Sequence, residues 1–317
     1  MAAKKQQVAV VAVGGNSLIQ DDKRVSVADQ YQAAANTMVH IVDMLEQGYN
    51  VVVTHGNGPQ VGFILMRSEI AAKQMHEVPL DSCVADTQGA IGYNFQMALA
   101  NEFKKRGMKR QAVTVVTQVL VDREDPAFKK PTKPIGKFYT KEEAHQRKEK
   151  DGWDIMEDAG RGWRRVVASP LPQEIIEEPS IKALVDGGFM VVAVGGGGIP
   201  VVRDEKGNLK GIAAVIDKDY ASALLAQRIG ADVFIISTAV EKIYLNFGKP
   251  EQKALEKVTM AELEKYASEG HFKPGSMLPK VKAVINFLRQ GGKHAIVTNP
   301  ENLARAVKGE AGTHVYP

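Results

Sequence analysis

Short apolar runs that end in glycine-rich loops are the most regular feature of the chain. The first run, residues 8–13, has six apolar and mostly β-branched side chains, which predict a buried strand. It stops abruptly at Gly-Gly-Asn-Ser. The three runs and their loops are 8–13 with 14–17, 51–54 with 55–59, and 190–194 with 195–198. Glycine turns let backbone N–H groups approach an anion closely, so we expect the three loops to meet around a phosphate-rich site.

The remaining pattern alternates helical and strand periodicity. The spacing predicts helices over 29–47, 62–75, 86–106, a segment ending at 181–187, 219–229, 260–269 and 280–290. It predicts further strands over 49–54, 111–121, 189–194, 233–237 and 294–298. Strand, helix and strand in this rhythm indicate βαβ units, and hence an α/β fold with a mainly parallel sheet.

One segment interrupts this rhythm. Residues 122–165, called the insert below, are polar, dense in charged side chains, and contain three prolines. A long solvated loop is the alternative, but more than about 15 structureless residues are uncommon within a compact domain. We therefore expect a single domain over 1–317 from which the insert protrudes as a small lid subdomain.

Composition and charge exclude several classes of protein. The chain has 317 residues, 44% hydrophobic and 25% charged, which is ordinary for a globular protein. A net charge of +4 is too small to indicate nucleic-acid binding. The single cysteine, Cys83, rules out an internal disulfide and fits a reducing compartment. No stretch has the length needed to cross a membrane, so we expect no membrane partner and a cytoplasmic location.

The familiar nucleotide-binding motifs are absent. Residues 275–280 come nearest to a Walker A loop but lack its second glycine, and 56–62 has one residue too many for a dinucleotide fingerprint. The missing fingerprint argues against a nicotinamide-dependent dehydrogenase. The seven histidines show no metal-ligand spacing, and no protein-held metal is expected. A phosphate-handling protein with this sequence needs another arrangement of cations.

Three lysines in constrained contexts could supply that arrangement. Lys133 lies in the insert within Thr-Lys-Pro-Ile-Gly, Lys218 lies just before a predicted helix, and Lys280 follows a glycine turn at the start of another. Phosphoryl transfer chiefly needs cations placed on the transferring group. The neighbouring Lys137 is interpreted as a solvated surface residue.

Several other polar or aromatic residues have more than one possible role. Asp217 and Asp219 flank Lys218 and could act as acid/base groups, ligate a metal, or only hold the lysine in place; for Asp217 a helix N-cap is favoured. His55 is favoured as a hydrogen-bonded structural residue. Tyr244 could face an adenine, or it could pack in the core.

Five segments together resemble the carbamate kinase family of the amino-acid kinase superfamily. They are 12–16 (AVGGN), 54–62 (THGNGPQVG), 195–201 (GGGGIPV), 214–219 (AVIDKD) and 272–281 (FKPGSMLPKV), in order over nearly the whole chain. The segment 132–136 (TKPIG) resembles part of the family's protruding subdomain. Ala239 and Lys137 depart from the family pattern, and neither is assigned a role.

This resemblance implies an open αβα sandwich, a homodimer, and reversible phosphoryl transfer from ATP to carbamate, giving ADP and carbamoyl phosphate. It implies Mg²⁺ bound with the nucleotide, and a use in making ATP at the end of arginine, agmatine or purine breakdown. The implied catalytic residues are Lys133, Lys218, Asp219 and Lys280. The implied substrate-binding residues are Gly14, Gly15, Asn16, Gly56, Asn57 and Gly58. The implied nucleotide-binding residues are Gly196, Gly197, Tyr244, Lys273, Gly275, Ser276 and Met277.

Two alternatives remain open at this point. Another amino-acid kinase could phosphorylate a carboxylate such as that of an acylated glutamate, although the insert argues against it. A non-catalytic nucleotide or anion sensor could also use this fold, but a sensor would have no need to retain the three lysines.

Overall fold

The structure is a computed structural model that describes residues 6–19, 23–158 and 160–317, without the side chain of Asn16. The helices are α1 Val27–Glu46, α2 Gly58–Ala71, α3 Leu80–Lys105, α4 Lys141–Asp151, α5 Glu178–Asp186, α6 Lys218–Arg228, α7 Met260–Ser268, α8 Met277–Arg289 and α9 Leu303–Ala306. The first nine strands are β1 Gln7–Val13, β2 Tyr49–His55, β3 Ala112–Thr114, β4 Gln118–Val121, β5 Lys133–Tyr139, β6 Asp154–Glu157, β7 Trp163–Val167, β8 Pro172–Ile175 and β9 Met190–Val192. The others are β10 Ile199–Arg203, β11 Leu209–Gly211, β12 Val233–Ser237, β13 Ile243–Leu245, β14 Lys253–Leu255, β15 Lys257–Thr259, β16 Ala295–Thr298 and β17 Thr313–Tyr316.

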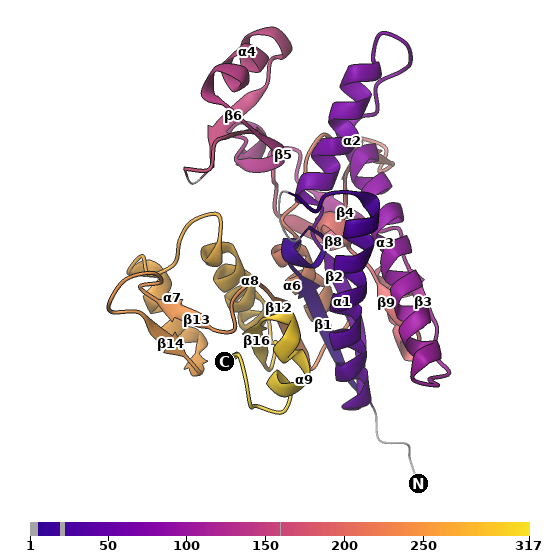
Figure 1. Cartoon of the computed structure of the whole chain (residues 1–317), viewed down its shortest axis with the longest axis vertical. Helices are drawn as coiled ribbons and strands as arrows, with labels where there is room; N and C mark the ends of the chain where they lie inside the picture. Colours follow the sequence, from indigo (N-terminus) through magenta and orange to yellow (C-terminus); the bar gives the residue numbers. More distant parts are fainter. Residues whose placement is uncertain (1–5, 20–22, 159) are drawn as a thin grey trace.

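An eight-stranded sheet forms the middle layer, in the order β15-β17-β16-β12-β1-β2-β9-β3. Its pairs are parallel except for β16 with β17. Alternate side chains of β1 point to opposite faces: Val10 and Ala12 join one core cluster, and Val11 and Val13 join the other. Helices α5, α6 and α8 cover the first face, and α1, α3 and α9 cover the second (Figure 1). The predicted αβα sandwich with a mainly parallel sheet is confirmed.

The run at 111–121 is not the single strand that its apolar pattern predicts. It divides into β3, at the end of the large sheet, and β4, in a separate four-stranded sheet ordered β11-β10-β4-β8. The division falls at Thr117, whose backbone N–H and carbonyl both hydrogen-bond to the buried side chain of Gln88 on α3, at 2.8 and 3.0 Å. A partner distant in sequence therefore ends the strand, which local periodicity does not reveal.

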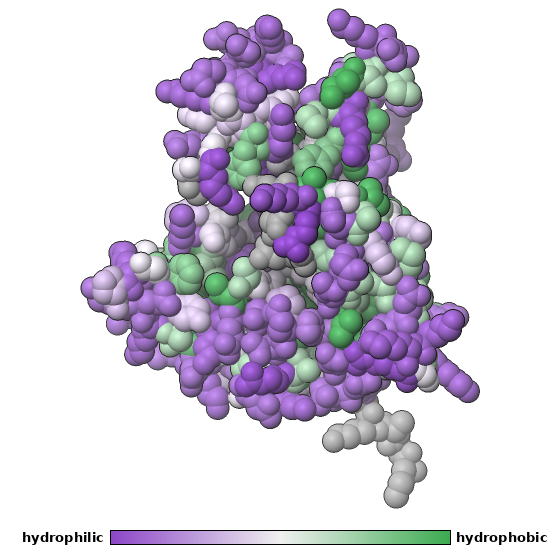
Figure 2. Space-filling view, in the orientation of Figure 1, coloured by the Kyte–Doolittle hydropathy of each residue, from purple (hydrophilic) through white to green (hydrophobic). Residues whose placement is uncertain are grey.

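The insert forms a small sheet of its own. β5, β7 and β6 pair antiparallel in that order, and α4 contacts all three strands. Figure 1 shows the insert standing above the main sheet beside α2. Its outer surface is strongly hydrophilic, and a notch separates it from the end of α2 (Figure 2). No helix among the described residues is long and apolar enough to span a membrane.

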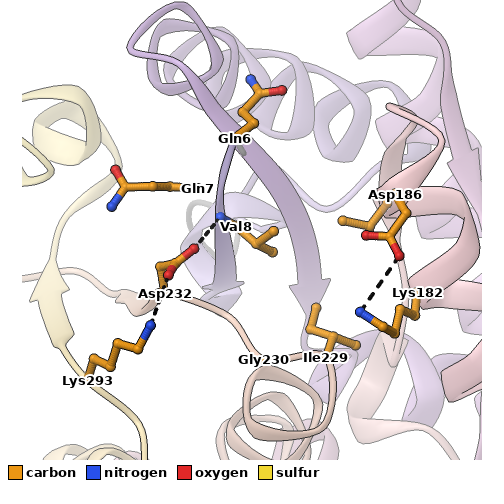
Figure 3. Close-up of a pocket in the computed structure, with 10 residues that line it drawn as sticks. Gln6, Gln7, Val8, Lys182, Asp186, Ile229, Gly230, Asp232 and Lys293 are labelled. Atoms are coloured by element: carbon orange, nitrogen blue, oxygen red, sulfur yellow. Dashed lines mark hydrogen bonds and ion pairs between the residues drawn. The ribbon is translucent and has the colours of Figure 1, made fainter. Parts of the chain in front are cut away.

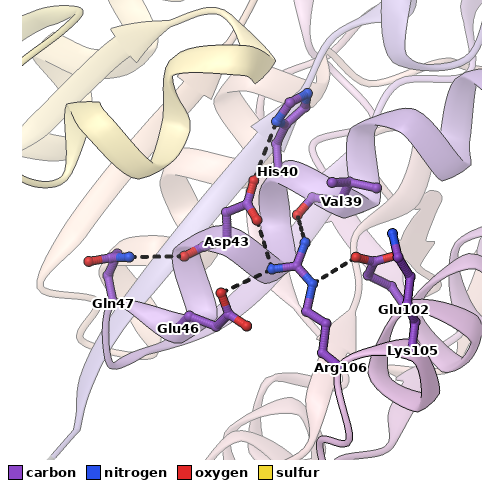
Figure 4. A network of polar contacts seen from close by, with 8 residues as sticks. All are labelled: Val39, His40, Asp43, Glu46, Gln47, Glu102, Lys105 and Arg106. Atoms are coloured by element: carbon purple, nitrogen blue, oxygen red, sulfur yellow. Dashed lines mark hydrogen bonds and ion pairs between the residues drawn. The ribbon is translucent and has the colours of Figure 1, made fainter.

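A polar network fastens α1 to the end of α3 (Figure 4). The Arg106 guanidinium contacts the carboxylates of Asp43, Glu46 and Glu102 at 2.7, 3.0 and 2.7 Å and donates a hydrogen bond to the Val39 carbonyl. Because Glu102 is buried, its charge needs this partner. The network holds α3 in place, and α3 carries side chains that shape the candidate site described next.

Candidate functional site

The three glycine loops meet at the carboxyl edge of the large sheet, where α/β proteins usually bind ligands. Loops after β1, β2 and β9 contribute to a cavity of about 230 Å³. The cavity lining includes most of the residues that the sequence singled out, namely Gly15, Gly56, Asn57, Gly58, Lys133, Gly196, Lys218, Asp219, Gly275, Ser276 and Lys280. The prediction that distant loops and lysines share one site therefore agrees with this geometry.

Asp219 lies at the centre of the cavity's charges. Its carboxylate accepts hydrogen bonds from Lys218 Nζ at 2.6 Å and from Lys280 Nζ at 3.0 Å. Burial alone would raise the pKa of Asp219, but the two ammonium groups hold that pKa well below its ordinary value. Asp219 stays ionised and orients both lysines.

The two lysines differ in their proton affinity. Burial lowers the pKa of Lys218, and the nearby positive charge of Lys280 lowers it further, against the attraction of Asp219. Burial also acts to lower the pKa of Lys280, but the attraction of Asp219 and Asp217 outweighs it, and the net pKa is raised. An anion bound beside Lys218 would therefore stabilise the charged form of this side chain, which burial and Lys280 disfavour in the free protein.

Asp217 links this pair to the insert. One of its carboxylate oxygens caps α6 by accepting the backbone N–H of Asp219 at 2.9 Å, as the sequence favoured. The other accepts a hydrogen bond from Lys133 Nζ at 2.6 Å, which the sequence did not indicate. Three ammonium groups thus face two carboxylates, which leaves one positive charge in excess at the cavity. This suits a phosphate group rather than a cation.

A second cavity, of about 270 Å³, lies at the amino ends of β1 and β12 (Figure 3). Its two lysines are already matched by carboxylates: Lys182 by Asp186 at 3.7 Å, and Lys293 by Asp232 at 3.4 Å. This second cavity has no excess of positive charge among its lining residues, so the cavity at the carboxyl edge is better suited to an anionic ligand.

Close packing around Gly196 shapes the glycine loops. A Cβ on Gly196 would lie 2.3 Å from Asn57 Nδ2, and its φ of +68° is itself unfavourable for other residues. The four-glycine loop can therefore lie directly against the Asn57 carboxamide. Asn57 in turn donates a hydrogen bond to Thr87 Oγ1 on α3 at 3.0 Å.

Three residues that the sequence did not single out, Thr87, Gln88 and Thr117, hold these loops. Gln88 Nε2 donates to the Gly195 carbonyl at 2.9 Å as well as to Thr117. Thr117 Oγ1 accepts the N–H of Val194, a β-branched residue held at a φ of +53°. Such a backbone costs of order 1–3 kcal/mol and is typical of functional sites. Thr87 and Gln88 were detectable only as polar side chains on the buried face of α3.

Several predicted residues lie outside the lining. Gly14 and Gly197 adjoin lining residues, and Lys273 and Met277 belong to the turn that contains Gly275 and Ser276. Tyr244 lies in β13 with its ring 5.8 Å from that of Phe247, and it does not line this cavity. The side chain of Asn16 lies outside the described part of the structure.

No general base is available among the described cavity residues. His55 is fully buried, burial lowers its pKa to about 4, and its Nδ1–H donates to the Gly56 carbonyl at 2.9 Å. It is therefore neutral and structural, as favoured from the sequence. Both aspartates are engaged with lysines. The described residues also contain no group of three or more potential ligands that could hold a metal ion. The site can position and neutralise an anion.

Comparisons with known proteins agree with this chemistry. A sequence model of the amino acid kinase family matches residues 7–299. The chain is 52% identical to "Carbamate kinase-like protein YahI" of Escherichia coli, with 98% of this chain and 99% of that protein covered. It is 48% identical to the carbamate kinase of Clostridium perfringens, with coverage of 96% and 98%. The structure of carbamate kinase from Giardia lamblia bound to AMP-PNP superposes with a TM-score of 0.91 at 40% identity, covering 98% of this chain and 99% of that one.

The charge of Asp219 gives a testable dependence of stability on pH. Because its folded-state pKa is depressed below the usual 3.8, its contribution to stability is complete above that pH and is lost as the pH falls towards the folded-state pKa. We expect Asp219→Asn to lower the free energy of unfolding by about 3 kcal/mol at neutral pH. The difference from wild type should narrow only below about pH 4.

Urea denaturation between neutral and acid pH measures this difference. Asp186→Asn, in an exposed ion pair, is the matched control and should change stability by less than about 1 kcal/mol. An equal effect of the two substitutions at pH 7, or a gap that is unchanged well below pH 4, would contradict the assignment.

Proposed function

The chain belongs to the amino acid kinase family, and we propose that it is the enzyme that reversibly transfers a phosphoryl group between ATP and carbamate, giving ADP and carbamoyl phosphate. The observation that carries this proposal is the buried Lys218–Asp219–Lys280 cluster beside two glycine-asparagine loops. The names of the relatives and the insert with its Lys133 favour carbamate as the acceptor.

The proposed reaction is a direct displacement. A carbamate oxygen attacks the γ-phosphorus, a new O–P bond forms, and the bond from phosphorus to the β,γ-bridging oxygen breaks, so that ADP leaves with that electron pair. Carbamate is already an anion near neutral pH and gives up no proton. The lack of a general base among the described cavity residues is consistent with this, since positioning and charge neutralisation are sufficient.

Each predicted residue has a proposed part in this reaction. Lys218 and Lys280 neutralise the transferring phosphoryl group, and Lys133 approaches it from the insert, which we propose acts as a lid. The backbone of the glycine loops holds carbamate and phosphoryl oxygens. The nucleotide lies over the Gly275 turn, with its base towards Tyr244. These proposed groups are Gly14, Gly15, Asn16, Gly56, Asn57 and Gly58 for the substrate, and Gly196, Gly197, Tyr244, Lys273, Gly275, Ser276 and Met277 for the nucleotide.

Mg²⁺ is proposed to enter with the nucleotide. Both aspartates that line the cavity are paired with lysines, so the described part of the chain offers no free carboxylate there, and this donor set fits a metal held chiefly by phosphate oxygens and water. When bound, Mg²⁺ neutralises negative charge on the β- and γ-phosphates. We also propose a cytoplasmic location, in keeping with the single buried cysteine, whose pKa burial raises to about 11.

The decisive assay is ATP formation from ADP and carbamoyl phosphate, with acetyl phosphate as the control donor. We expect ATP with the first donor and little with the second. Lys218→Met and Lys280→Met should each lower kcat by about 10²-fold or more, the scale of losing one strong electrostatic contact in a transition state. Lys137→Met is the matched control, because Lys137 is exposed and lies over the Tyr139 ring, and its kcat should stay within about two-fold of wild type.

Each other outcome points to a different function. ATP binding without turnover would support a sensor. Turnover with an acylated glutamate but not with carbamoyl phosphate would support another amino-acid kinase. Unchanged kcat in both lysine variants would sink the proposed roles.

A homodimer is proposed through the end of the sheet that carries β3. Gly92 of α3 lies directly on Thr114 of β3, and the nearby Tyr93 and Val116 expose 63% and 57% of their surface. Edge strands and exposed apolar side chains are typical of interfaces. Light scattering should give twice the chain mass for wild type and the single-chain mass for Tyr93→Glu. Ile70→Glu, at an exposed site on α2, should stay dimeric, and a monomeric wild type would refute the proposal.

A further inference from the structure

The insert touches the main body through an unusually close contact between two glycines. Gly62 lies in the second turn of α2, and Gly136 lies in β5 with a φ of +71°. A Cβ on Gly62 would lie 2.2 Å from both the N and the Cα of Gly136, whereas ordinary contacts begin near 3.4 Å. Helix and strand therefore meet backbone to backbone, and any side chain at Gly62 must push β5 away by about 1 Å.

Two side-chain contacts continue the same seam along α2. Glu69 forms an ion pair with Arg165 of β7, and the Tyr139 hydroxyl of β5 lies 4.0 Å from Met66 Sδ. Figure 1 shows the insert beside α2 along this line. These contacts hold the small sheet of the insert in position relative to the carboxyl edge of the large sheet.

The position of Lys133 depends on this seam. Lys133 is the first residue of β5, three residues before Gly136, and its Nζ reaches Asp217 at the cavity, 2.6 Å away. Since both residues belong to one strand, a shift of Gly136 away from α2 carries Lys133 with it. The seam thus determines how far the Lys133 ammonium group enters the cavity.

We propose that Gly62 is a positioning residue for phosphoryl transfer: the absence of a side chain there seats β5 so that Lys133 reaches the transferring group. Glu69 helps to hold β5 and β7 in this position through its ion pair with Arg165. This rests on the proposed function only in giving Lys133 an anion to act on. A displacement near 1 Å in a catalytic group typically costs about 10²-fold in rate.

A double-mutant cycle with Lys133 tests the proposal. Gly62→Ala should lower kcat for ATP formation by about 10²-fold in the wild-type background. In the Lys133→Ala background the same substitution should change kcat by less than about three-fold, because the group that it displaces is gone. Independent losses that multiply in the double variant would overturn the proposal. Ile70→Ala, an exposed position on the same helix, is the control and should leave kcat unchanged.

A second readout does not depend on activity. Amide hydrogen exchange over 133–139 should accelerate in Gly62→Ala while exchange in β1 and β12 stays as in wild type. Unchanged exchange over 133–139 would overturn the proposal even if the proposed reaction is correct. A wild type that makes no ATP refutes the proposed function, and the amide exchange measurement then still tests the role of Gly62.

If Gly62→Ala does not fold, Glu69→Gln and its double variant with Lys133→Ala can be used in the same double-mutant cycle. We then expect Glu69→Gln to lower kcat about ten-fold only when Lys133 is present.

Discussion

The Asp219 carboxylate, held between two buried lysines, is the interaction on which the site depends. In water such pairs are worth little, but at this cavity the side chains of Lys218, Asp219 and Lys280 are only 11%, 4% and 18% exposed. Without Asp219, burial would favour loss of the Lys218 proton, because two cations would face each other in a poorly solvated space. The Asp217 cap at the start of α6 places Lys218 and Asp219 in the first turn, where the helix dipole also favours an anion. One helix start therefore places Lys218 and the carboxylate that holds Lys280, and it leaves the cavity suited to an anion.

The glycine loops depend on a different scaffold. Helix α3 supplies two buried side chains, Thr87 and Gln88, which hydrogen-bond to the loops after β2 and β9. These bonds bring Asn57 against Gly196 at a distance that no side chain would allow. The glycine loops are thus hydrogen-bonded to buried side chains of α3, whereas Lys133 belongs to the separate sheet of the insert. If the cavity binds a phosphoryl group as proposed, the loops would hold that group, and the approach of Lys133 would depend on the position of the insert.

Much of this could be predicted from the sequence, and the failures share one cause. β1, β2 and β12 are buried on both faces, so their β-branched runs are unambiguous, and α1 follows clear helical spacing. The lysines stood out because each adjoins a turn or a helix start. The division of 111–121 by Gln88, the pairing of Lys133 with Asp217, and the short strand β17 beside β16 all depend on partners distant in the chain. Local patterns carry no record of such partners. Tyr244 is the opposite case: the sequence singled it out as a residue that could face an adenine, but it does not line the cavity.

Burial lowers the pKa of Lys218 and the charge of Lys280 lowers it further, although Asp219 accepts a hydrogen bond from its Nζ at 2.6 Å. If a phosphate group binds beside Lys218 as proposed, it should raise this pKa and draw a proton from the solvent in the pH range where the free side chain has begun to lose it. Calorimetric titration with AMP-PNP at a series of alkaline pH values, in buffers of different ionisation enthalpy, measures that proton directly. We expect net proton uptake by the wild type at some of these pH values and its loss in Lys218→Met. Equal uptake by both proteins, or none in the wild type, would contradict this expectation.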